Sequence, residues 1–308
     1  MDGVLVIDKP AGCTSHDVVA RARRALGETR IGHTGTLDPF ATGVLPLVIG
    51  RATRLASFLS GAEKEYDARI RFGCATDTFD ATGVVAHDPA GRRARDIAVL
   101  PPDGLSRESV EQALSQFRGA FDQQPPRYSA KKIGGVPAHR LVRRNRDVQP
   151  SPVRVSVARL ELSAFSDGVA EVRVCASAGF YVRSLAHDLG AALGCGAYLE
   201  ALRRLRSGSF TLADAVPLEV VQREGAGAAG RVLPLHRLLP EMPAVHLTDQ
   251  GARKASHGND LVPADVVESP GSRGGEAPRI RLLDGGGRLL GLAEPGPGGL
   301  LHPVVVLV

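Results

Sequence analysis

The chain has 308 residues, a formal net charge of +5 and 43% hydrophobic residues. This length suffices for one large and one small domain, each with a buried core. Residues 241–308 hold six Lys/Arg and eight Asp/Glu, so residues 1–240 carry a net charge of +7. This excess of basic residues predicts that a polyanion binds to residues 1–240. The four cysteines form no Cys-x-x-Cys pair, which argues against a zinc site and a disulfide framework.

The apolar run Val4-Leu5-Val6-Ile7 is followed at once by Asp8 and Lys9. The run is too short for a signal-peptide core and for a membrane span, so we expect a cytoplasmic protein with reduced thiols and no membrane partner. The sequence contains no Walker A motif, no GxGxxG after a strand and no HExxH. Nucleotide cofactors and zinc-protease chemistry therefore have no sequence support.

The first third of the chain predicts strands and capped helices. Residues 3–8 form an apolar run typical of a buried strand, and Thr14 or Ser15 can cap a helix over residues 16–26, which Gly27 ends. Further strands are predicted at 44–49, which is uniformly apolar, and at 66–72, where apolar and polar residues alternate. Ser106 can cap a helix that reaches Phe117.

In the middle of the chain, residues 153–162 and 169–176 alternate at period two and predict two strands. From Tyr181 onward the apolar residues follow helical spacing, which places Tyr181 and Arg183 in the first turn of a helix. A second helix is predicted over residues 198–205. The low-complexity run at 225–230 is predicted to be a flexible surface loop.

After Pro240 and Pro243 the pattern changes to short strands and turns. Strands are predicted at 244–247, 279–283, 288–293 and 304–308. Strands and helices that mix without βαβ regularity predict an α+β fold rather than a doubly wound one.

The segment Arg30-Ile31-Gly32-His33-Thr34-Gly35-Thr36-Leu37-Asp38-Pro39 places one carboxylate at the end of a glycine- and threonine-rich loop. Pro39 disfavours helix at the preceding residue, so Asp38 is predicted to project from an extended or turn conformation. Gly32 and Gly35 allow the backbone to approach a ligand closely.

The string GHTGTLDP, followed by FATGVLPLVIGRATRL, resembles the signature of the TruB-type pseudouridine synthases, the bacterial tRNA pseudouridine-55 synthases. The resemblance implies a central mixed, mainly antiparallel sheet flanked by helices in residues 1–240, with a basic RNA-gripping insertion at about 123–147. Residues 241–308 resemble a small, β-barrel-like PUA-type RNA-binding domain through their strands at 281–284, 290–293 and 302–305.

The family resemblance implies a cofactor-independent isomerase that flips the T-loop uridine at position 55 of tRNA out of its stack and converts it to pseudouridine. Asp38 would be the nucleophile, since a carboxylate can attack an electrophilic carbon and be expelled again. The sequence leaves open whether it attacks C6 of the base or C1′ of the ribose. Arg183, in Gly179-Phe180-Tyr181-Val182-Arg183, would pair with Asp38 and orient it.

Other matches imply contacts to the substrate. Tyr66, in Lys64-Glu65-Tyr66-Asp67, would stack on uracil, while Tyr181 and Leu202 would border the base and His33 would contact the RNA as the uridine turns out. Lys9 matches an N-terminal family motif and is assigned a structural role.

A basic segment runs from Arg127 to Asp147, with seven Lys/Arg against one acidic residue. Its stretch from Gln124 to Lys132 resembles the RNA-gripping insertion of the family, so phosphate contacts are predicted for Arg127, Lys131, Lys132 and Arg140. The sequence departs from the family in two places: Ala138 stands where an aromatic residue is usual, and Phe180 replaces a commoner threonine.

The predicted partner is the T-arm stem-loop of tRNA, with no metal and no obligatory protein partner or guide RNA. Three alternatives remain: a noncatalytic RNA-binding protein or tRNA chaperone, a nucleoside N-glycosylase, and a guide-RNA-dependent rRNA-modifying enzyme. The Asp38 and Arg183 pair argues against a pure binder. A glycosylase would release free uracil, and a guide-dependent enzyme would usually carry partner-binding extensions.

Overall fold

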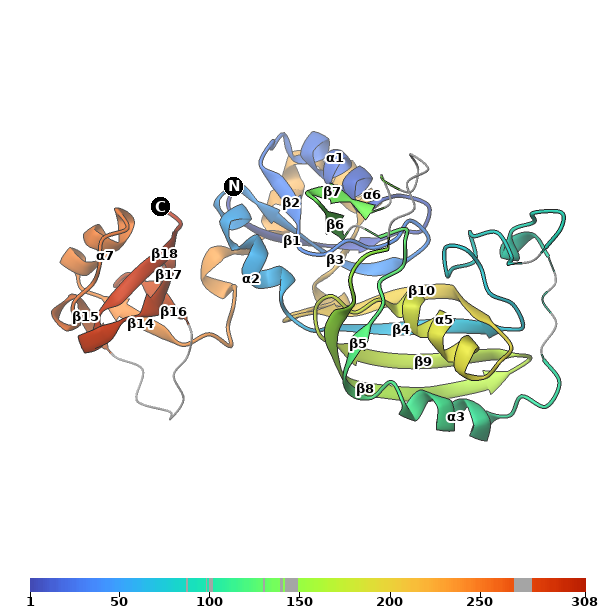
Figure 1. Ribbon diagram of the computed structural model, residues 1–308. Coiled ribbons are helices and arrows are strands. Elements are labelled where there is room, and N and C mark those ends of the chain that lie inside the picture. The colour runs from blue at the N-terminus through green and yellow to red at the C-terminus, as the bar shows by residue number, and fades with distance from the viewer. Residues whose placement is uncertain are drawn as a thin grey trace.

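The computed structural model describes residues 1–86, 88–97, 99, 102–129, 131–138, 141, 149–268 and 279–308. These residues form one large sheet, a five-stranded sheet near the C-terminus and a small two-stranded hairpin (Figure 1). The helices are distributed around the sheets without βαβ regularity, so the α+β prediction is confirmed.

The large sheet has eleven strands in the order β12-β1-β3-β10-β4-β9-β8-β5, with β13, β2 and β11 paired to β1, β3 and β10. The bounds are β1 Gly3–Lys9, β2 Ile31–His33, β3 Thr42–Ile49, β4 Lys64–Phe72, β5 Gly119–Gln123, β8 Val153–Ser166, β9 Val169–Ala176, β10 Ala197–Ser207, β11 Phe210–Thr211, β12 Val216–Pro217 and β13 Leu233–Pro234. Among the described strands of this sheet, β1 with β12 and β3 with β10 pair in parallel and the others pair antiparallel.

The uniformly apolar strands β1 and β3 are buried on both faces. Leu5 and Ile7 contribute to the core beneath the helices, whereas Val4 and Val6 join a second cluster that includes Leu292 of the C-terminal sheet. A strand covered on both faces needs apolar residues at every position, which explains why neither run alternates.

Strand β4 alternates because only one of its faces is covered. Tyr66, Ala68 and Ile70 point into the core, and Asp67 points to the opposite face, where Arg173 of β9 pairs with it at 2.8 Å. The central part of the sheet thus has one apolar face and one charged face.

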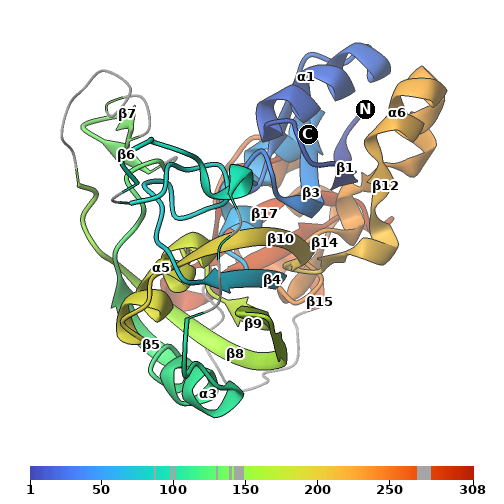
Figure 2. The same cartoon turned by 90° about the vertical axis from the view of Figure 1, so that its right-hand side faces the viewer.

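The helices within the described residues are α1 Ser15–Leu26, α2 Ala56–Ser60, α3 Arg107–Ser115, α5 Val182–Ala192, α6 Leu218–Glu224 and α7 Asp249–Ser256. Helix α1 begins at the Thr14 capping box and ends at Gly27 in the left-handed conformation, as predicted. Helices α1 and α6 lie side by side (Figure 2), and Val18 of α1 and Val221 of α6 lie in the same core. Helix α3 is capped by Ser106 but ends at Ser115, two residues before the predicted Phe117.

Short 3₁₀ turns connect several of these elements. They are η1 Gly50–Leu55, η2 Ala94–Asp96, η3 Leu212–Asp214, η4 Gly225–Arg231, η5 Leu235–Arg237, η6 Pro263–Asp265 and η7 Pro297–Gly299.

The helix predicted over residues 198–205 is wrong, because this segment belongs to strand β10 in the middle of the sheet. Its pairing with β4 shifts register between Leu199 and Ala201, which marks a β-bulge. The extra residue separates the inward side chains of Leu199 and Leu202 by three positions instead of two. That spacing imitates the period of a helix and misled the prediction.

The surface loop predicted at 225–230 is correct only in part: Ala226, Gly227 and Gly230 are exposed, but the segment is not irregular. Residues Gly225–Arg231 form the 3₁₀ turn η4, and Ala228 is fully buried in the main core. The turn contacts α1 and α6, whereas its low complexity suggested a flexible surface loop.

The C-terminal sheet follows the order β15-β14-β16-β17-β18. Its strands are β14 Ala244–Leu247, β15 Val266–Glu268, β16 Ile280–Leu283, β17 Leu289–Pro295 and β18 Leu301–Val306. The pattern missed the short strand β15 and helix α7, whose Ala255 packs into the core of this sheet. An isolated β-bridge between Leu261 and Leu301 places the segment before β15 beside β18, the strand at the other edge of this sheet. The sheet is therefore curved, with its two edges brought together as in a partly closed barrel. None of the described helices is long and apolar enough to cross a membrane.

Gly43 sets the spacing between β3 and β10. Its φ is +100°, and a Cβ there would lie 2.2 Å from the carbonyl oxygen of Arg204. We expect Gly43→Ala to lower the free energy of unfolding by ~3 kcal/mol or more, because strain and the backbone clash add. Gly27→Ala is the matched control: φ is +65° with no atom within 4 Å, so ~1 kcal/mol is expected. If both variants lost the same free energy of unfolding in denaturant titrations, the close contact between Gly43 and β10 would not contribute to stability.

Candidate active site

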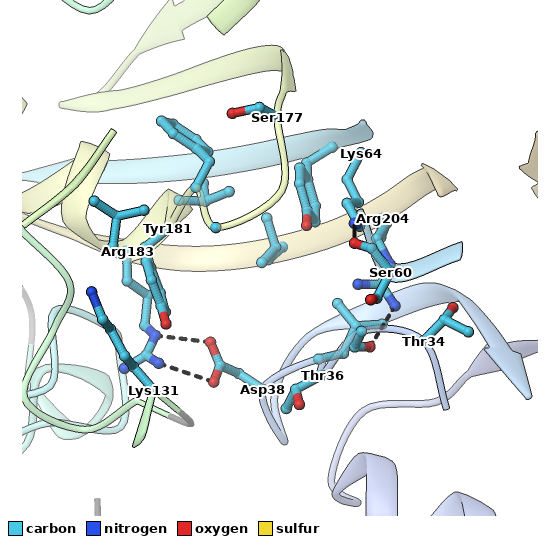
Figure 3. Close-up of a pocket in the computed structure, with 18 residues that line it drawn as sticks. Thr34, Thr36, Asp38, Ser60, Lys64, Lys131, Ser177, Tyr181, Arg183 and Arg204 are labelled. Atoms are coloured by element: carbon cyan, nitrogen blue, oxygen red, sulfur yellow. Dashed lines mark hydrogen bonds and ion pairs between the residues drawn. The ribbon is translucent and has the colours of Figure 1, made fainter. Parts of the chain in front are cut away.

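A cavity of about 630 Å³ opens between the loop that carries Asp38 and the strands β4 and β10 (Figure 3). It brings together segments that lie far apart in the sequence. Its lining residues are Thr34, Gly35, Thr36, Leu37, Asp38, Ser60, Lys64, Tyr66, Lys131, Val153, Ser177, Gly179, Phe180, Tyr181, Val182, Arg183, Leu202 and Arg204.

The Asp38 loop is held by hydrogen bonds on both sides of the carboxylate. The Ser15 hydroxyl, in the first turn of α1, accepts from Leu37 N at 2.9 Å and donates to Leu37 O at 3.2 Å. On the other side, Pro39 O accepts from Gly12 N at 2.8 Å and from the Lys9 ammonium at 3.3 Å. Lys9 is fully buried and also donates to Cys13 O, and burial lowers its pKa. The loop backbone is therefore fixed before any ligand arrives.

Arg183 binds the Asp38 carboxylate with two nitrogens. Its Nε lies 2.8 Å from Oδ2, and its Nη2 donates to Oδ1 at 3.1 Å. The Arg183 side chain is only 6% exposed and the Asp38 side chain 30%, so the carboxylate keeps one accessible side (Figure 3). The Nη2 hydrogen bond and the close Nε contact together fix the direction of the carboxylate.

The guanidinium of Arg183 is itself held by the surrounding chain. Nη1 donates to Thr78 O at 3.1 Å, and Nη2 also donates to Tyr128 O at 3.0 Å. The buried Asp80 carboxylate lies 3.8 Å from Nη1, and Thr82 N donates to it. The sequence analysis missed Asp80, because nothing along the chain indicates that residues 78–80 pack beside α5.

Tyr181 is the N-cap of α5 rather than a residue of its first turn. Its backbone is bracketed by the buried Gln123 side chain, which accepts from Tyr181 N at 2.8 Å and donates to Tyr181 O at 3.0 Å. Burial raises the pKa of Tyr181, although a hydrogen bond with Ser129 opposes the shift. The phenol is thus neutral at physiological pH and borders Asp38 in the cavity.

Tyr66 and Leu202 come from the neighbouring strands β4 and β10 and are both buried. Phe180, one of the two residues that depart from the family pattern, lines the same cavity. Together these side chains supply an aromatic and apolar wall, which suits the flat face of a base.

The cavity is also lined by Thr34, Lys64 and Arg204. No site role was predicted for these polar residues from the sequence. Lys64 donates to Ser60 O and to Ala62 O, and Arg204 donates to Val44 O at 2.6 Å and to Gly35 O at 3.1 Å. Lys64 was visible in the sequence only as the flank of Tyr66, and Arg204 was assigned to the erroneous helix.

His33 is not among the residues that line the cavity. It packs edge-on against His16 with 5.5 Å between ring centroids, and its Nδ1 accepts weakly from Gly35 N. Burial, with smaller contributions from the charges of His16 and Arg204, lowers the pKa of His33 to about 4. Its imidazole is therefore neutral at physiological pH.

The basic segment is described only in part. Lys131 lines the cavity near Asp38, and its ammonium donates to Ser151 O at 2.7 Å. Arg127 lines a separate cavity of about 330 Å³ with Phe79 and Tyr128. Arg140 and the Lys132 side chain lie outside the described residues. Ala138 is fully buried, and its N donates to Lys131 O at 2.8 Å.

A carboxylate fixed by a guanidinium beside an aromatic wall is equipped for nucleophilic attack on a base or sugar. No cluster of three or more His, Cys, Asp or Glu able to hold a metal occurs within the part of the chain that the structure describes.

Comparison with known proteins identifies the family. The TruB family pseudouridylate synthase N-terminal domain matches residues 23–182, and the tRNA pseudouridylate synthase B C-terminal domain matches residues 183–239. The chain is 42% identical over 311 residues to tRNA pseudouridine synthase B of Solibacter usitatus, covering 100% of both chains. It is 46% identical to the protein of the same name from Symbiobacterium thermophilum, over 84% of this chain and 82% of that one.

The fold also has solved counterparts. A chain in the crystal structure of a Cbf5-Nop10-Gar1 complex matches with a TM-score of 0.74 and 25% identity, over 99% of this chain and 85% of that chain. A chain in an H/ACA RNP bound to a substrate RNA matches with a TM-score of 0.71 and 24% identity, over 99% of this chain and 85% of that chain. Sequence and fold agree with the resemblance carried by the Asp38 loop, and the chain belongs to the TruB family of pseudouridylate synthases, which are isomerases.

Proposed function

We propose that this enzyme isomerises the T-loop uridine at position 55 of tRNA to pseudouridine, with Asp38 as the nucleophile. The observation that carries the proposal is the Asp38 carboxylate, which Arg183 grips with two nitrogens beside Tyr66, Tyr181 and Leu202. The relatives named tRNA pseudouridine synthase B support the choice of tRNA as the substrate.

The target base must leave its stack before Asp38 reaches it, which costs a few kcal/mol. The aromatic and apolar wall of Tyr66, Phe180 and Leu202 would hold the flipped uracil by stacking and contact. Phosphate contacts from Arg127, Lys131, Lys132 and Arg140 would offset the remaining cost and supply much of the affinity. His33, which lies just before the Asp38 loop, would meet the RNA as a neutral imidazole.

The reaction breaks the N1–C1′ bond, turns the bound uracil and joins C5 to C1′; C5 then loses its hydrogen as a proton, and N1 takes up a proton. Asp38 would form a transient bond to carbon, at C6 of uracil or C1′ of the ribose, and be expelled when the product forms. Arg183 would orient the carboxylate before the attack and bind it again when it is expelled. No electrons are gained or lost overall, so the chemistry requires no cofactor.

We assign the catalytic domain to residues 1–240 and a PUA-like RNA-binding domain to residues 241–308. The change from the large sheet to the separate sheet β15-β14-β16-β17-β18 supports this division. The curved C-terminal sheet would recognise RNA by shape and backbone contacts, without an obligatory protein partner or guide RNA.

The first test is Asp38→Asn, which keeps the shape of the side chain and removes the nucleophile. With a tRNA transcript carrying tritium at uridine C5, we expect the wild type to release one equivalent of tritium and the variant to be slower by more than about a thousandfold. Affinity for tRNA should change by no more than about twofold. Release of free uracil by the wild type would indicate a glycosylase, and tight binding without any release a tRNA chaperone.

A second test replaces Arg183 by Lys, which preserves the charge but not the fork. We expect kcat to fall about a hundredfold with little change in RNA affinity, because a point charge cannot hold both carboxylate oxygens. The control is Arg173→Lys, since Arg173 donates from two nitrogens to the Asp67 carboxylate on the outer face of the sheet. If kcat fell by a similar factor in both variants, the loss would come from reduced protein stability and not from the contact between Arg183 and Asp38.

A third test addresses the basic segment. Lys131→Ala with Lys132→Ala should weaken tRNA binding and reduce the slope of log affinity against log salt by about one for each phosphate that the protein no longer neutralises. Arg231→Ala serves as a control, since Arg231 is already paired with Glu224 at 2.6 Å. An unchanged slope in the double variant would mean that both lysines are ordinary surface charges.

A further inference from the structure

We propose that the end of the cavity bounded by Thr34, Lys64 and Arg204 binds one phosphodiester of the RNA strand, next to the nucleotide that reaches Asp38. The inference rests on the proposed function for the identity of the polyanion. It assigns a site for the backbone within the active-site cavity, separate from the basic segment at Arg127–Asp147.

Two cations at this end of the cavity are buried without a counterion among the described residues. Lys64 is 7% exposed and Arg204 is 1% exposed. The acceptors that they contact are carbonyl oxygens, and within the described part of the chain neither pairs with a carboxylate. Burying an unpaired charge is expensive, so two such cations at one end of a cavity favour a site where an anion compensates them at some stage.

Hydrogen-bond donors also remain unused at this end of the cavity. Lys64 engages two of its three N–H groups, and Arg204 engages Nε and Nη2 but not Nη1. The hydroxyl of Thr34 is buried without a hydrogen-bond partner among the described residues. Since a buried hydroxyl is normally satisfied, its lack of a partner points to a ligand that supplies an acceptor.

The basic groups at this end of the cavity also repel one another. Burial, and then the charge of Arg204, lowers the pKa of Lys64 to about 8, and Arg204 also contributes to the lowered pKa values of His33 and Lys9. A uracil carbonyl could be held by neutral donors and would relieve little of this repulsion. A phosphodiester carries a full negative charge and two free oxygens, which suits two cations and a hydroxyl.

The placement fits one inserted nucleotide. Lys64, Arg204, Ser60 and Thr34 lie together on one side of the cavity, and the pair of Asp38 and Arg183 lies on the other (Figure 3). A base at Asp38 with its sugar in the middle would direct a backbone phosphate towards Lys64. Arg204 donates to Gly35 O, so a bound phosphate would also tie the RNA to the loop that carries Asp38.

The test is a double-mutant cycle between protein and RNA. A T-arm stem-loop is made with a neutral methylphosphonate at the phosphate 5′ or 3′ of the target uridine, and its affinity is measured by fluorescence anisotropy. We expect Thr34→Val and Lys64→Met each to weaken binding of natural RNA about tenfold. With the neutral linkage at one of these two positions, the same substitutions should cause no further loss.

Thr34→Val is expected to fold normally, because removing a buried hydroxyl without a partner should leave Tm unchanged or raise it. A loss of affinity in this variant would therefore not come from misfolding. Thr53→Val is the matched control: the Thr53 hydroxyl donates to Gly50 O at 2.7 Å, and its substitution should show no coupling to either linkage. If the loss of RNA affinity caused by Thr34→Val or Lys64→Met adds fully to the loss caused by each neutral linkage, the proposed phosphate site is wrong.

The tritium-release assay separates this failure from that of the proposed function. Additive losses with normal tritium release would remove the phosphate site and leave the isomerase in place. Coupling without tritium release would support the phosphate site and refute the isomerisation of this uridine.

Discussion

The pairing of Asp38 with Arg183 is the interaction on which the arrangement of the site depends. It joins the loop between β2 and β3 to the first turn of α5, and through Arg183 it reaches Thr78 O and Tyr128 O. A cation in the first turn opposes the helix dipole, so Arg183 would be unfavourable at the start of α5 without these acceptors. The same contacts that offset this cost also direct the carboxylate into the cavity.

The rest of the fold serves to keep that carboxylate in a fixed place. Strand β3 continues directly from the Asp38 loop, and its parallel contact with β10 at Gly43 brings Arg204 to Gly35 O. On the other side, Lys9 at the end of β1 and Ser15 at the start of α1 hold Pro39 and Leu37. Rigid elements therefore surround the loop, which is the condition for electrostatic preorganisation of a nucleophile.

The sequence predicted those parts of the fold whose signals are local. The cap at Thr14, the left-handed Gly27 and the alternation in β4 are properties of a few adjacent residues. Strand β10 was missed because a bulge changes the spacing of its inward residues, and η4 because burial of Ala228 depends on a distant helix. Asp38 and Arg183 were found through motifs, whereas Asp80, Lys64 and Arg204 become visible only when the chain is folded. The roles of the predicted site residues stay predictions.

The two ends of the cavity differ in whether their cations have a counterion. At one end, Arg183 has Asp38 as its counterion, so that pair is complete in the free protein. At the other end, Lys64 and Arg204 have only carbonyl dipoles, and the buried hydroxyl of Thr34 has no partner within the described structure. Such an incomplete set is tolerated where a ligand supplies the missing charge, because the repulsion that it stores is released on binding. Free uridine lacks the phosphodiester that would complete the set, so the cavity would favour a nucleotide within an RNA strand.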